Sequence, residues 1–334
     1  MSTQEKARGS NSPSFARILW LDYGMILIAI LIFLFCCFMV PRFFTIFNLR
    51  SLALAVSMTG MVACTMMLVL ASGNFDMSCG AVIACSGVVA AVVIRAVSAG
   101  YENVEDAAVL SMVAGIGAAL LVGLIIGLIN GMTIAYARIN ALITTLATMQ
   151  ITRGFGYIFG EGKAVGIVQE DFFKLGNNMW LGIPVPVYIT VACFIAFGII
   201  LEKTAFGRNT LAIGGNEEAA NLAGIRVAKH KLKLFVIHGL MAAFAGIVMA
   251  SRMTSGQPTV SQGFELDVIS ACVLGGISMA GGIASIWYVV AGVLIMGMMQ
   301  NSMNLVGVQT FYQYVARGAI LLVAVIFDRY KQRR

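Results

Sequence analysis

Residues 107–129 read AAVLSMVAGIGAALLVGLIIGLI, an apolar run that holds no charged side chain. A helix needs about 20 apolar residues to cross the hydrocarbon core of a bilayer, so this run is long enough to span a membrane. Similar runs recur to the end of the 334-residue chain, in which 60% of residues are hydrophobic and 11% are charged. Soluble domains carry about 25% charged residues. The pattern therefore predicts an all-α, polytopic transmembrane helical bundle rather than a large soluble core.

The apolar runs predict about ten membrane-spanning helices within one transmembrane domain at residues 23–327. The expected spans are residues 23–40, 51–71, 79–97, 107–129, 140–160, 183–201, 233–252, 266–281, 287–306 and 311–327. An even number of crossings places the N-terminal tail, residues 1–22, and the C-terminal tail, residues 328–334, on the same side of the membrane.

Basic residues explain the net charge of +7 and indicate which side that is. They cluster in the two tails and in the segment 202–232 between two spans. Such clusters can bind nucleic acid. Between apolar spans, however, they follow the excess of lysine and arginine in cytoplasmic loops. We therefore expect both termini and the segment 202–232 in the cytoplasm, and no nucleic-acid partner.

Two glycine-bracketed patches interrupt the apolar runs, at residues 72–80 and 274–282. Overlaid, they align Gly73 with Gly275, Met77 with Met279 and Gly80 with Gly282. Internal duplications are common in transporters. Because the match is short, the sequence leaves open whether these patches record a duplication or a chance similarity.

A third set of glycines lies at the end of the run quoted above and just beyond it. Gly123, Gly127 and Gly131 are four residues apart, so they share one face of a helix. Small residues on one face let a second helix approach closely, and close packing drives helix association in lipid. We expect this stripe to be a packing surface.

The most informative polar segment lies in the expected cytoplasmic region. Asn216 can cap a short helix by accepting backbone hydrogen bonds, and the carboxylates of Glu217 and Glu218 would then lie at the positive end of the helix dipole. Ala219 and Ala220 continue the helix with little bulk.

Gly224 would end this helix in a left-handed conformation. The segment thus predicts a small two-turn helix below the membrane. The alternative reading is an ordinary loop helix without a special role.

A few polar residues in or beside the spans are candidates for lining a path across the membrane. A carboxylate at bilayer depth costs about 2.5–3.5 kcal/mol, so Asp76 needs a function or a partner. With Ser78 it either lines the path or caps the helix that begins near residue 78. Thr144 and Thr148 lie one turn apart and, with Gln150, offer further polar groups, although threonine also bonds to its own helix.

The sequence gives no reason to expect catalytic residues or a metal site. It lacks the G-x-x-x-x-G-K-[ST] phosphate loop. Gly162-Lys163 comes nearest, but Ala164 replaces the required hydroxyl. No Ser–His–Asp set converges, and the seven cysteines lack metal-ligand spacing. We expect a transport protein that cannot hydrolyse ATP by itself and is not an enzyme.

Two motifs resemble those of a known family. Glu218-Ala219-Ala220, three residues and Gly224 are similar to the EAA motif of ABC importer permeases, in which it forms the helix that docks on the ATPase subunit. The patch at residues 75–78 resembles the Asp-Leu-Ser signature of the ribose/xylose/arabinose permease family, with Met77 in place of leucine. Longer strings similar to the arabinose branch of that family are residues 140–150, 162–166 and 251–258.

The resemblance implies a permease that imports a monosaccharide, expected to be L-arabinose, across a bacterial inner membrane. Its implied partners are an ABC ATPase subunit, a periplasmic sugar-binding protein, a second copy of the permease and membrane lipid. The chain itself would bind no cofactor, because ATP and Mg are used by the ATPase. The alternative is an ion-coupled secondary sugar transporter with Asp76 at its centre, and a channel or structural membrane protein is a third possibility.

Overall fold

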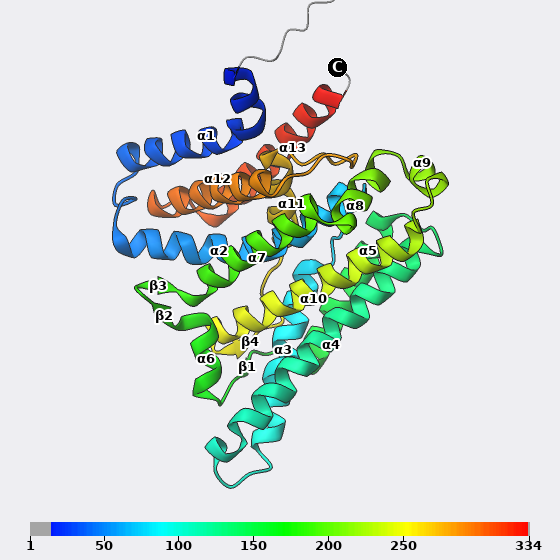
Figure 1. Ribbon diagram of the computed structural model, residues 1–334. Coiled ribbons are helices and arrows are strands. Elements are labelled where there is room, and N and C mark those ends of the chain that lie inside the picture. The colour runs from blue at the N-terminus through cyan, green and yellow to red at the C-terminus, as the bar shows by residue number, and fades with distance from the viewer. Residues whose placement is uncertain (1–14, 333–334) are drawn as a thin grey trace, which may run out of the picture.

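The computed structural model describes residues 15–332, so the outer parts of both predicted tails lie outside it. Helices dominate this range (Figure 1). The helices are α1 Phe15–Met39, α2 Ile46–Ala71, α3 Cys79–Ser98, η1 Val104–Ala107, α4 Ala108–Ala135, α5 Ala141–Phe159, α6 Glu170–Asn177, α7 Val185–Lys203, α8 Ala205–Gly215, α9 Glu217–Leu222, α10 Val227–Met253, α11 Phe264–Gly275, α12 Ile286–Leu305 and α13 Thr310–Gln332.

Every one of the ten predicted spans overlaps a helix, but the helices differ in their ability to cross a bilayer. Six are long and apolar enough, namely α2, α3, η1 with α4, α7, α10 and α12. Two shorter apolar stretches belong to α1 and α13. The helices α5 and α11 fall outside both groups. Helix α5 is rich in threonine and glycine, and α11 has 12 residues and carries Glu265 and Asp267 in its first turn.

The predicted span at residues 266–281 is wrong in its extent. Helix α11 has 12 residues and ends at Gly275, because Gly276 adopts a left-handed φ of 115°. At 1.5 Å per residue it measures about 18 Å, which is too short for a hydrocarbon core of about 30 Å. Gly281 and Gly282 also have positive φ values, so the chain stays irregular until α12 begins.

The glycine stripe of α4 packs directly against α10, as predicted. A β-carbon on Gly123 would overlap the carbonyl oxygen of Gly239, and one on Gly127 would lie 2.7 Å from the carbonyl of Phe235. These contacts are possible only where both backbones lie bare against each other. Helices α3, α4 and α10 run side by side in Figure 1 and form the tightest part of the bundle.

The main hydrophobic core lies around α2, which is buried along most of its length from Ser57 to Ala71. Helices α7, α10, α11 and α12 pack against α2, and Cys79, Val82 and Ile83 of α3 join the same buried cluster. The large buried side chains include Met66 and Met67 of α2 and Phe235 of α10. The central helices are thus enclosed by protein and not by lipid.

The two glycine-bracketed patches meet in the folded chain. The amide of Gly282 donates a hydrogen bond of 2.9 Å to the carbonyl of Ala71, where α2 ends. A β-carbon on Gly281 would lie 2.8 Å from the amide nitrogen of Gly73. The chain therefore brings its two major helix interruptions into one junction at the same end of the bundle.

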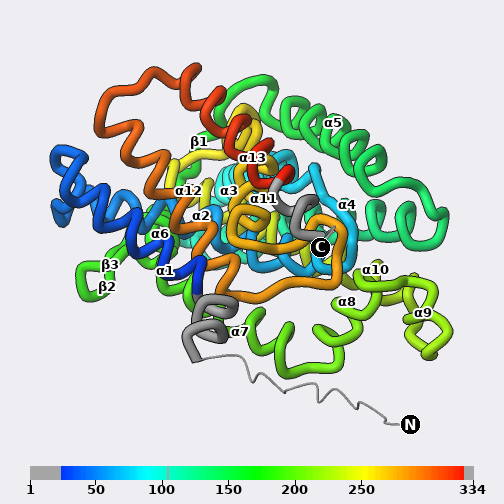
Figure 2. Tube along the Cα trace, turned by 90° about the horizontal axis from the view of Figure 1, so that it is seen from above, coloured from blue at the N-terminus to red at the C-terminus, as the bar shows by residue number. Residues whose placement is uncertain are grey.

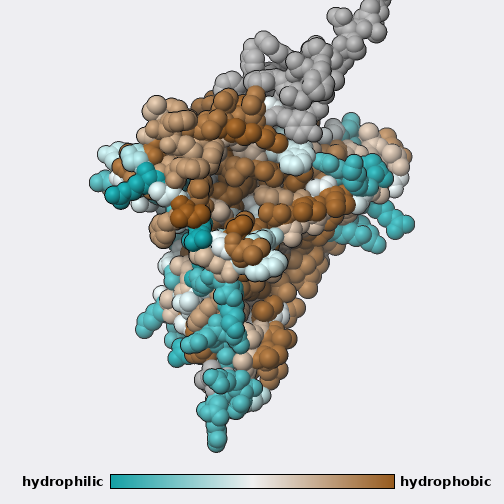
Figure 3. All heavy atoms as spheres, turned by 60° about the vertical axis from the view of Figure 1, so that its left-hand side comes forward, coloured by the Kyte–Doolittle hydropathy of each residue, from teal (hydrophilic) through white to brown (hydrophobic). Residues whose placement is uncertain are grey.

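Four two-residue strands lie at the opposite end. Strand β1, Val165–Gly166, pairs antiparallel with β4, Ser255–Gly256, and β2, Met179–Trp180, pairs with β3, Ile183–Pro184. Figure 2 shows α9 at the rim of the molecule, far from α1. In Figure 3, hydrophobic residues cover the middle of the visible face and hydrophilic ones gather toward its lower tip and edges, as expected for a membrane protein.

Candidate coupling and translocation site

Helix α9 begins as its sequence predicts. The side chain of Asn216 accepts a hydrogen bond of 2.9 Å from the amide of Ala219, which satisfies one free donor of the first turn. Glu217 and Glu218 occupy that first turn and are exposed. The predicted cap and the predicted placement of the acids are both confirmed.

The end of α9 also follows the prediction. Gly224 has a φ of 88°, and the amide of Ile225 donates to the carbonyl of Ala220 at 3.1 Å, which closes the last turn. A β-carbon on Gly224 would meet no atom of this chain within 4 Å. Glycine is therefore favoured here by backbone conformation, and any intolerance of bulk must come from a partner.

Helix α9 presents one face to the body and the other to solvent. Ala220 is buried in a small cluster with Ile213 and Val227. On the outer face, Leu222 is 85% exposed and is flanked by Ala219 and Ala223, which are exposed as well. Sequence reasoning missed Leu222, although an apolar residue among small exposed ones is the signal that could have found it.

One ion pair ties α9 to the bundle. The ammonium group of Lys231 on α10 lies 2.6 Å from a carboxylate oxygen of Glu217. The lysine side chain is 11% exposed and the glutamate 59%, so solvent weakens the pair on one side. With the cluster around Ala220, this pair fixes the position of a helix that otherwise projects from the molecule.

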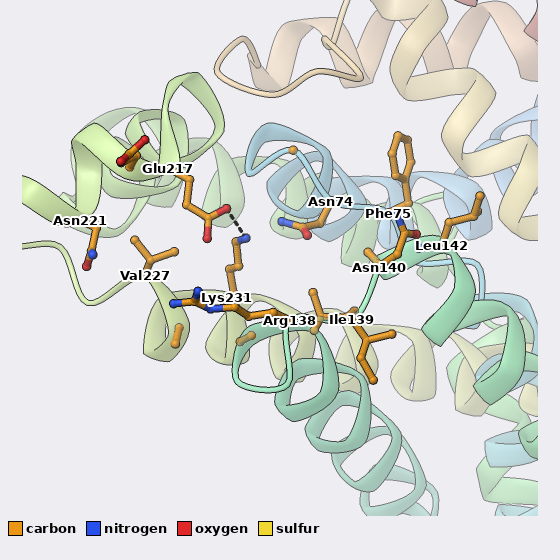
Figure 4. Close-up of a pocket in the computed structure, with 16 residues that line it drawn as sticks. Asn74, Phe75, Arg138, Ile139, Asn140, Leu142, Glu217, Asn221, Val227 and Lys231 are labelled. Atoms are coloured by element: carbon orange, nitrogen blue, oxygen red, sulfur yellow. Dashed lines mark hydrogen bonds and ion pairs between the residues drawn. The ribbon is translucent and has the colours of Figure 1, made fainter.

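A polar pocket of about 960 Å³ opens between α9 and the first helix interruption. In Figure 4, Glu217 and Lys231 point toward each other on one side of it, and Asn74 and Phe75 stand on another. Arg138 and Asn140 come from the turn between α4 and α5. The lining residues are Gly73, Asn74, Phe75, Ile134, Ala135, Arg138, Ile139, Asn140, Ala141, Leu142, Glu217, Glu218, Asn221, Val227, Ala228 and Lys231.

The end of α8 links α9 to both helix interruptions. A β-carbon on Gly214 would overlap the carbonyl oxygen of Ala71 and lie 2.5 Å from the amide of Gly282. The next residue, Gly215, has open space around it. Motion of α9 can thus reach the interruptions through a backbone contact at Gly214.

A chain of buried hydrogen bonds joins the start of α3 to α4 and α5. Asp76 accepts bonds from the amide and the hydroxyl of Ser78, at 2.7 and 2.6 Å. The side chain of Asn130 donates to the Ser78 hydroxyl at 3.0 Å and accepts from Thr148 at 2.7 Å. Both bonds to Asp76 come from Ser78, the residue before α3, and no side chain caps the first turn of that helix, so the capping alternative is not confirmed.

The structure brings together some of the candidate path residues and separates one. Thr144 and Thr148 are both buried on the same face of α5, and the Thr144 hydroxyl has no hydrogen-bond partner among the described residues. Gln150 is exposed on another face of that helix. Asn130, which completes the network, was not predicted, since it stands in sequence as one polar residue within the glycine stripe of α4.

Within residues 15–332, no group of three or more histidine, cysteine or acidic side chains is arranged to hold a metal ion. The polar groups of the site are amides, hydroxyls and charged side chains without a nucleophile–base arrangement. Hydrogen bonding to a neutral polar solute is what such groups can do chemically.

Comparison with known proteins agrees with a membrane protein of several spans. A family model described as "Branched-chain amino acid transport system / permease component" matches residues 48–325, and the chain belongs to this family. It is a transport subunit and not an enzyme in its own right.

Among curated relatives, the L-arabinose transport system permease protein AraH of Escherichia coli (strain K12) is 56% identical over 333 residues, covering 100% of this chain and 98% of that protein. The L-arabinose ABC transporter permease protein AraH of Azospirillum brasilense is 47% identical over 93% of this chain and 88% of its own length. The ribose import permease protein RbsC of Bacillus subtilis (strain 168) is 39% identical over 87% of each chain. No solved structure matches the chain.

Proposed function

We propose that this chain is the membrane-spanning permease of a bacterial ABC importer and passes L-arabinose into the cytoplasm. The observation that carries the proposal is its 56% identity, over the full chain, with a protein named for L-arabinose transport. The ribose import permease protein of Bacillus subtilis is less similar, at 39% identity. ATP and Mg would be used by a separate ATPase subunit, and a periplasmic protein would deliver the sugar.

Helix α9 is the part of the chain that would meet the ATPase. It projects from the bundle, its outer face is made of small residues, and Leu222 offers one large apolar side chain to a groove. Buried apolar anchors contribute most of the binding energy of protein interfaces. Closure of the ATPases would push α9, and the contact at Gly214 would carry this motion to the two helix interruptions.

The polar pocket would serve as the inner vestibule of the path. It lies beside α9 and reaches Asn74 and Phe75, which immediately precede the Asp76–Ser78 turn. Its amide side chains, such as Asn74 and Asn221, offer both donors and acceptors to sugar hydroxyls. A sugar leaving the path would pass this lining before it enters the cytoplasm.

A second copy of the chain would complete the path. Gln150 lies within α5 and is exposed. An exposed amide facing lipid would lose its hydrogen bonds, which is costly. We therefore place the partner copy or the path on the face of α5 that carries Gln150, as a symmetric dimer would allow.

The proposed topology has ten crossings of the inner membrane, one of which is made by α11 together with the irregular residues 276–285, and it places both tails and the coupling segment 202–232 in the cytoplasm. Reporter fusions at residues 100 and 170 should read as periplasmic, and a fusion at residue 216 should read as cytoplasmic. A cytoplasmic signal at residue 170 would contradict this arrangement.

The energy source separates this proposal from a secondary transporter. Uptake of labelled L-arabinose should stop when ATP is depleted and should persist when the proton gradient is collapsed at constant ATP. The hydrogen bonds of Asp76 also favour the ABC importer over the ion-coupled carrier. Its Oδ1 accepts from both the Ser78 amide and the Ser78 hydroxyl, which is a structural role. Uptake that follows the proton gradient at constant ATP would favour the ion-coupled alternative.

A further inference from the structure

Arg153 of α5 holds a loop that belongs to a distant part of the chain. Its guanidinium donates to the carbonyls of Pro258 at 3.1 Å, Val260 at 2.6 Å and Ser261 at 3.3 Å. These carbonyls belong to residues 257–263, which connect β4 to α11 and which we call the outer loop. One cation thus binds three of the seven residues of the outer loop and, among the described residues, forms no ion pair with a carboxylate.

A carboxylate nevertheless lies within reach of this arginine. Glu265, in the first turn of α11, is 7% exposed, and its Oε2 has no hydrogen-bond partner among the described residues. Oε2 and the Ser261 carbonyl both lie within 2.6 Å of the position a β-carbon on Gly80 would take, so the two oxygens are within about 5 Å of each other. The charges of Glu265 and Arg153 also act on each other.

The other side of α11 shows what a completed pair looks like. Asp267 forms an ion pair of 3.0 Å with Arg317 of α13. The first turn of α11 is therefore linked to α13 through a closed carboxylate–arginine pair. Toward α5 it is linked only through the backbone of the outer loop, while Glu265 keeps an acceptor free.

We propose that Arg153 and Glu265 form a two-position latch on the outer side of the transport path, a proposal that rests on the function given above. In the conformation described here Arg153 binds the carbonyls of the outer loop and keeps the loop closed. In the open conformation Arg153 exchanges those carbonyls for the carboxylate of Glu265, and the loop is released.

The two positions are close in energy because each satisfies one set of acceptors and leaves the other unsatisfied. The closed position satisfies the loop carbonyls, and the open position satisfies the carboxylate of Glu265. Guanidinium offers five donors in a planar fork, which suits either several carbonyls or one carboxylate. A charge-assisted pair is stronger than a bond to a neutral carbonyl. Against this, the released carbonyls must find water. A small displacement of α11 at the Asp267–Arg317 ion pair can therefore change which of the two sets of acceptors Arg153 binds.

Two strained or buried features of the outer loop support a change of position there. Ser261 adopts a φ of 60°, a left-handed conformation that a non-glycine residue takes at some cost. Its hydroxyl is buried and has no hydrogen-bond partner among the described residues. If the loop moves into water, Ser261 can leave the left-handed conformation and its hydroxyl can bond to water. The closed loop is therefore held against a local tendency to open.

The test uses Ser261→Cys as a reporter, because the substituted side chain is buried while the loop is closed. A membrane-impermeant maleimide is applied to intact cells that make the whole importer, and the unsubstituted chain measures labelling of the native cysteines. Adding Arg153→Gln should raise labelling at least about tenfold, because the charged hydrogen bonds to the loop are lost. Arg153→Lys should give an intermediate rise, since one ammonium cannot bind three carbonyls in a fork.

Glu265→Gln should lower uptake and leave labelling unchanged. Labelling should stay at the reporter's level, because the closed position does not use Oε2, and L-arabinose uptake should fall at least about tenfold, because the open position loses its charged acceptor. Lys174→Gln, which removes an exposed charge paired with Asp171, is the matched control and should change neither readout.

Normal uptake with Glu265→Gln, or unchanged labelling with Arg153→Gln, would overturn the latch. Co-purification of the ATPase with each variant shows that the chain has folded, and Arg153→Lys carries the test if Arg153→Gln does not fold. If the unsubstituted importer fails to take up L-arabinose with ATP, the proposed function fails instead, while labelling still reports on the loop.

Discussion

The packed bundle and helix α9 use small residues for opposite purposes. Between α4 and α10, glycines such as Gly123 and Gly239 bring two backbones into contact, so the space that a side chain would take is filled by this chain itself. In α9 and the two residues after it, Ala219, Ala223 and Gly224 face solvent, and a β-carbon on Gly224 would meet no atom within 4 Å. Small residues that are not covered by their own chain leave room for a partner.

The difference teaches where rigidity and motion are expected. The bundle is fixed by backbone contacts between helices that leave no space for an added side-chain atom. Helix α9 is fixed by one partly exposed ion pair and a small cluster around Ala220. Between them lies Gly214, whose contact with Ala71 and Gly282 is as tight as those of the bundle. Helix α9 is thus held to the bundle by few contacts, and the end of α8 before it touches both helix interruptions at one close backbone contact.

The largest effect is expected where the bundle is tightest. Gly123→Leu should prevent assembly of the importer, because the added side chain must separate α4 from α10 and overpacking of this kind costs about 3 kcal/mol or more. Gly117→Leu is the matched control on the same helix, since a β-carbon there meets nothing within 4 Å. Detergent-solubilised yield and thermal stability measure both. Equal stability of the two variants would contradict the packing difference.

The next effect concerns the attachment between α9 and the bundle. Gly214→Ala places a β-carbon on the carbonyl of Ala71, so the end of α8 must shift away from both helix interruptions. We expect uptake to fall about tenfold, equivalent to about 1.4 kcal/mol, while the ATPase still binds. Gly215→Ala has open space and should transport normally. A similar loss in both variants would remove the argument for a specific contact at Gly214.

An effect of similar size is expected at the outer face of α9. Leu222→Ala should weaken ATPase binding by about 1–2 kcal/mol, as truncation of an interface anchor does, and should leave the stability of the isolated permease unchanged. Titration of purified ATPase against permease in nanodiscs gives the affinity. Ala223→Ser, a small change on the same face, is the control. An unchanged affinity with Leu222→Ala would mean that this side chain is not an anchor.

The smallest effect is expected within the buried polar network. Thr148→Val removes the hydroxyl that donates to Asn130 and should destabilise the permease by about 1 kcal/mol. Gln150→Leu, on an exposed face of the same helix, should leave the stability of the single chain unchanged. Thermal unfolding of the purified permease compares them. A more stable Thr148→Val variant would show that the network is not needed for packing.

The positions of the helices were predictable because apolar runs of membrane length report directly on them. The end of α11 was not, because one sequence feature has two structural outcomes. Gly123 packs within a helix, whereas Gly276 takes a φ of 115° and ends one. Nothing in the neighbouring residues distinguishes a glycine chosen for close packing from one chosen for its backbone conformation.

The candidate site divides in the same way between local and distant interactions. The cap at Asn216 and the left-handed Gly224 were predictable because both depend on bonds within a few residues. The bond between Asn130 and Ser78 joins residues 52 apart, and the pocket is lined by four separate segments. Such contacts follow from tertiary packing, which local sequence patterns do not specify.

The measurement that tests the coupling role of α9 most directly is co-purification of the ATPase subunit with two variants. Gly224→Glu adds bulk, removes the favoured left-handed conformation and brings a third acid beside Glu217 and Glu218. Asp76→Asn keeps its shape but loses a charge inside the bundle. We predict that Gly224→Glu loses both the ATPase and uptake, and that Asp76→Asn retains the ATPase even if uptake falls. Normal docking and normal uptake with Gly224→Glu would contradict the assignment of α9 as the coupling helix.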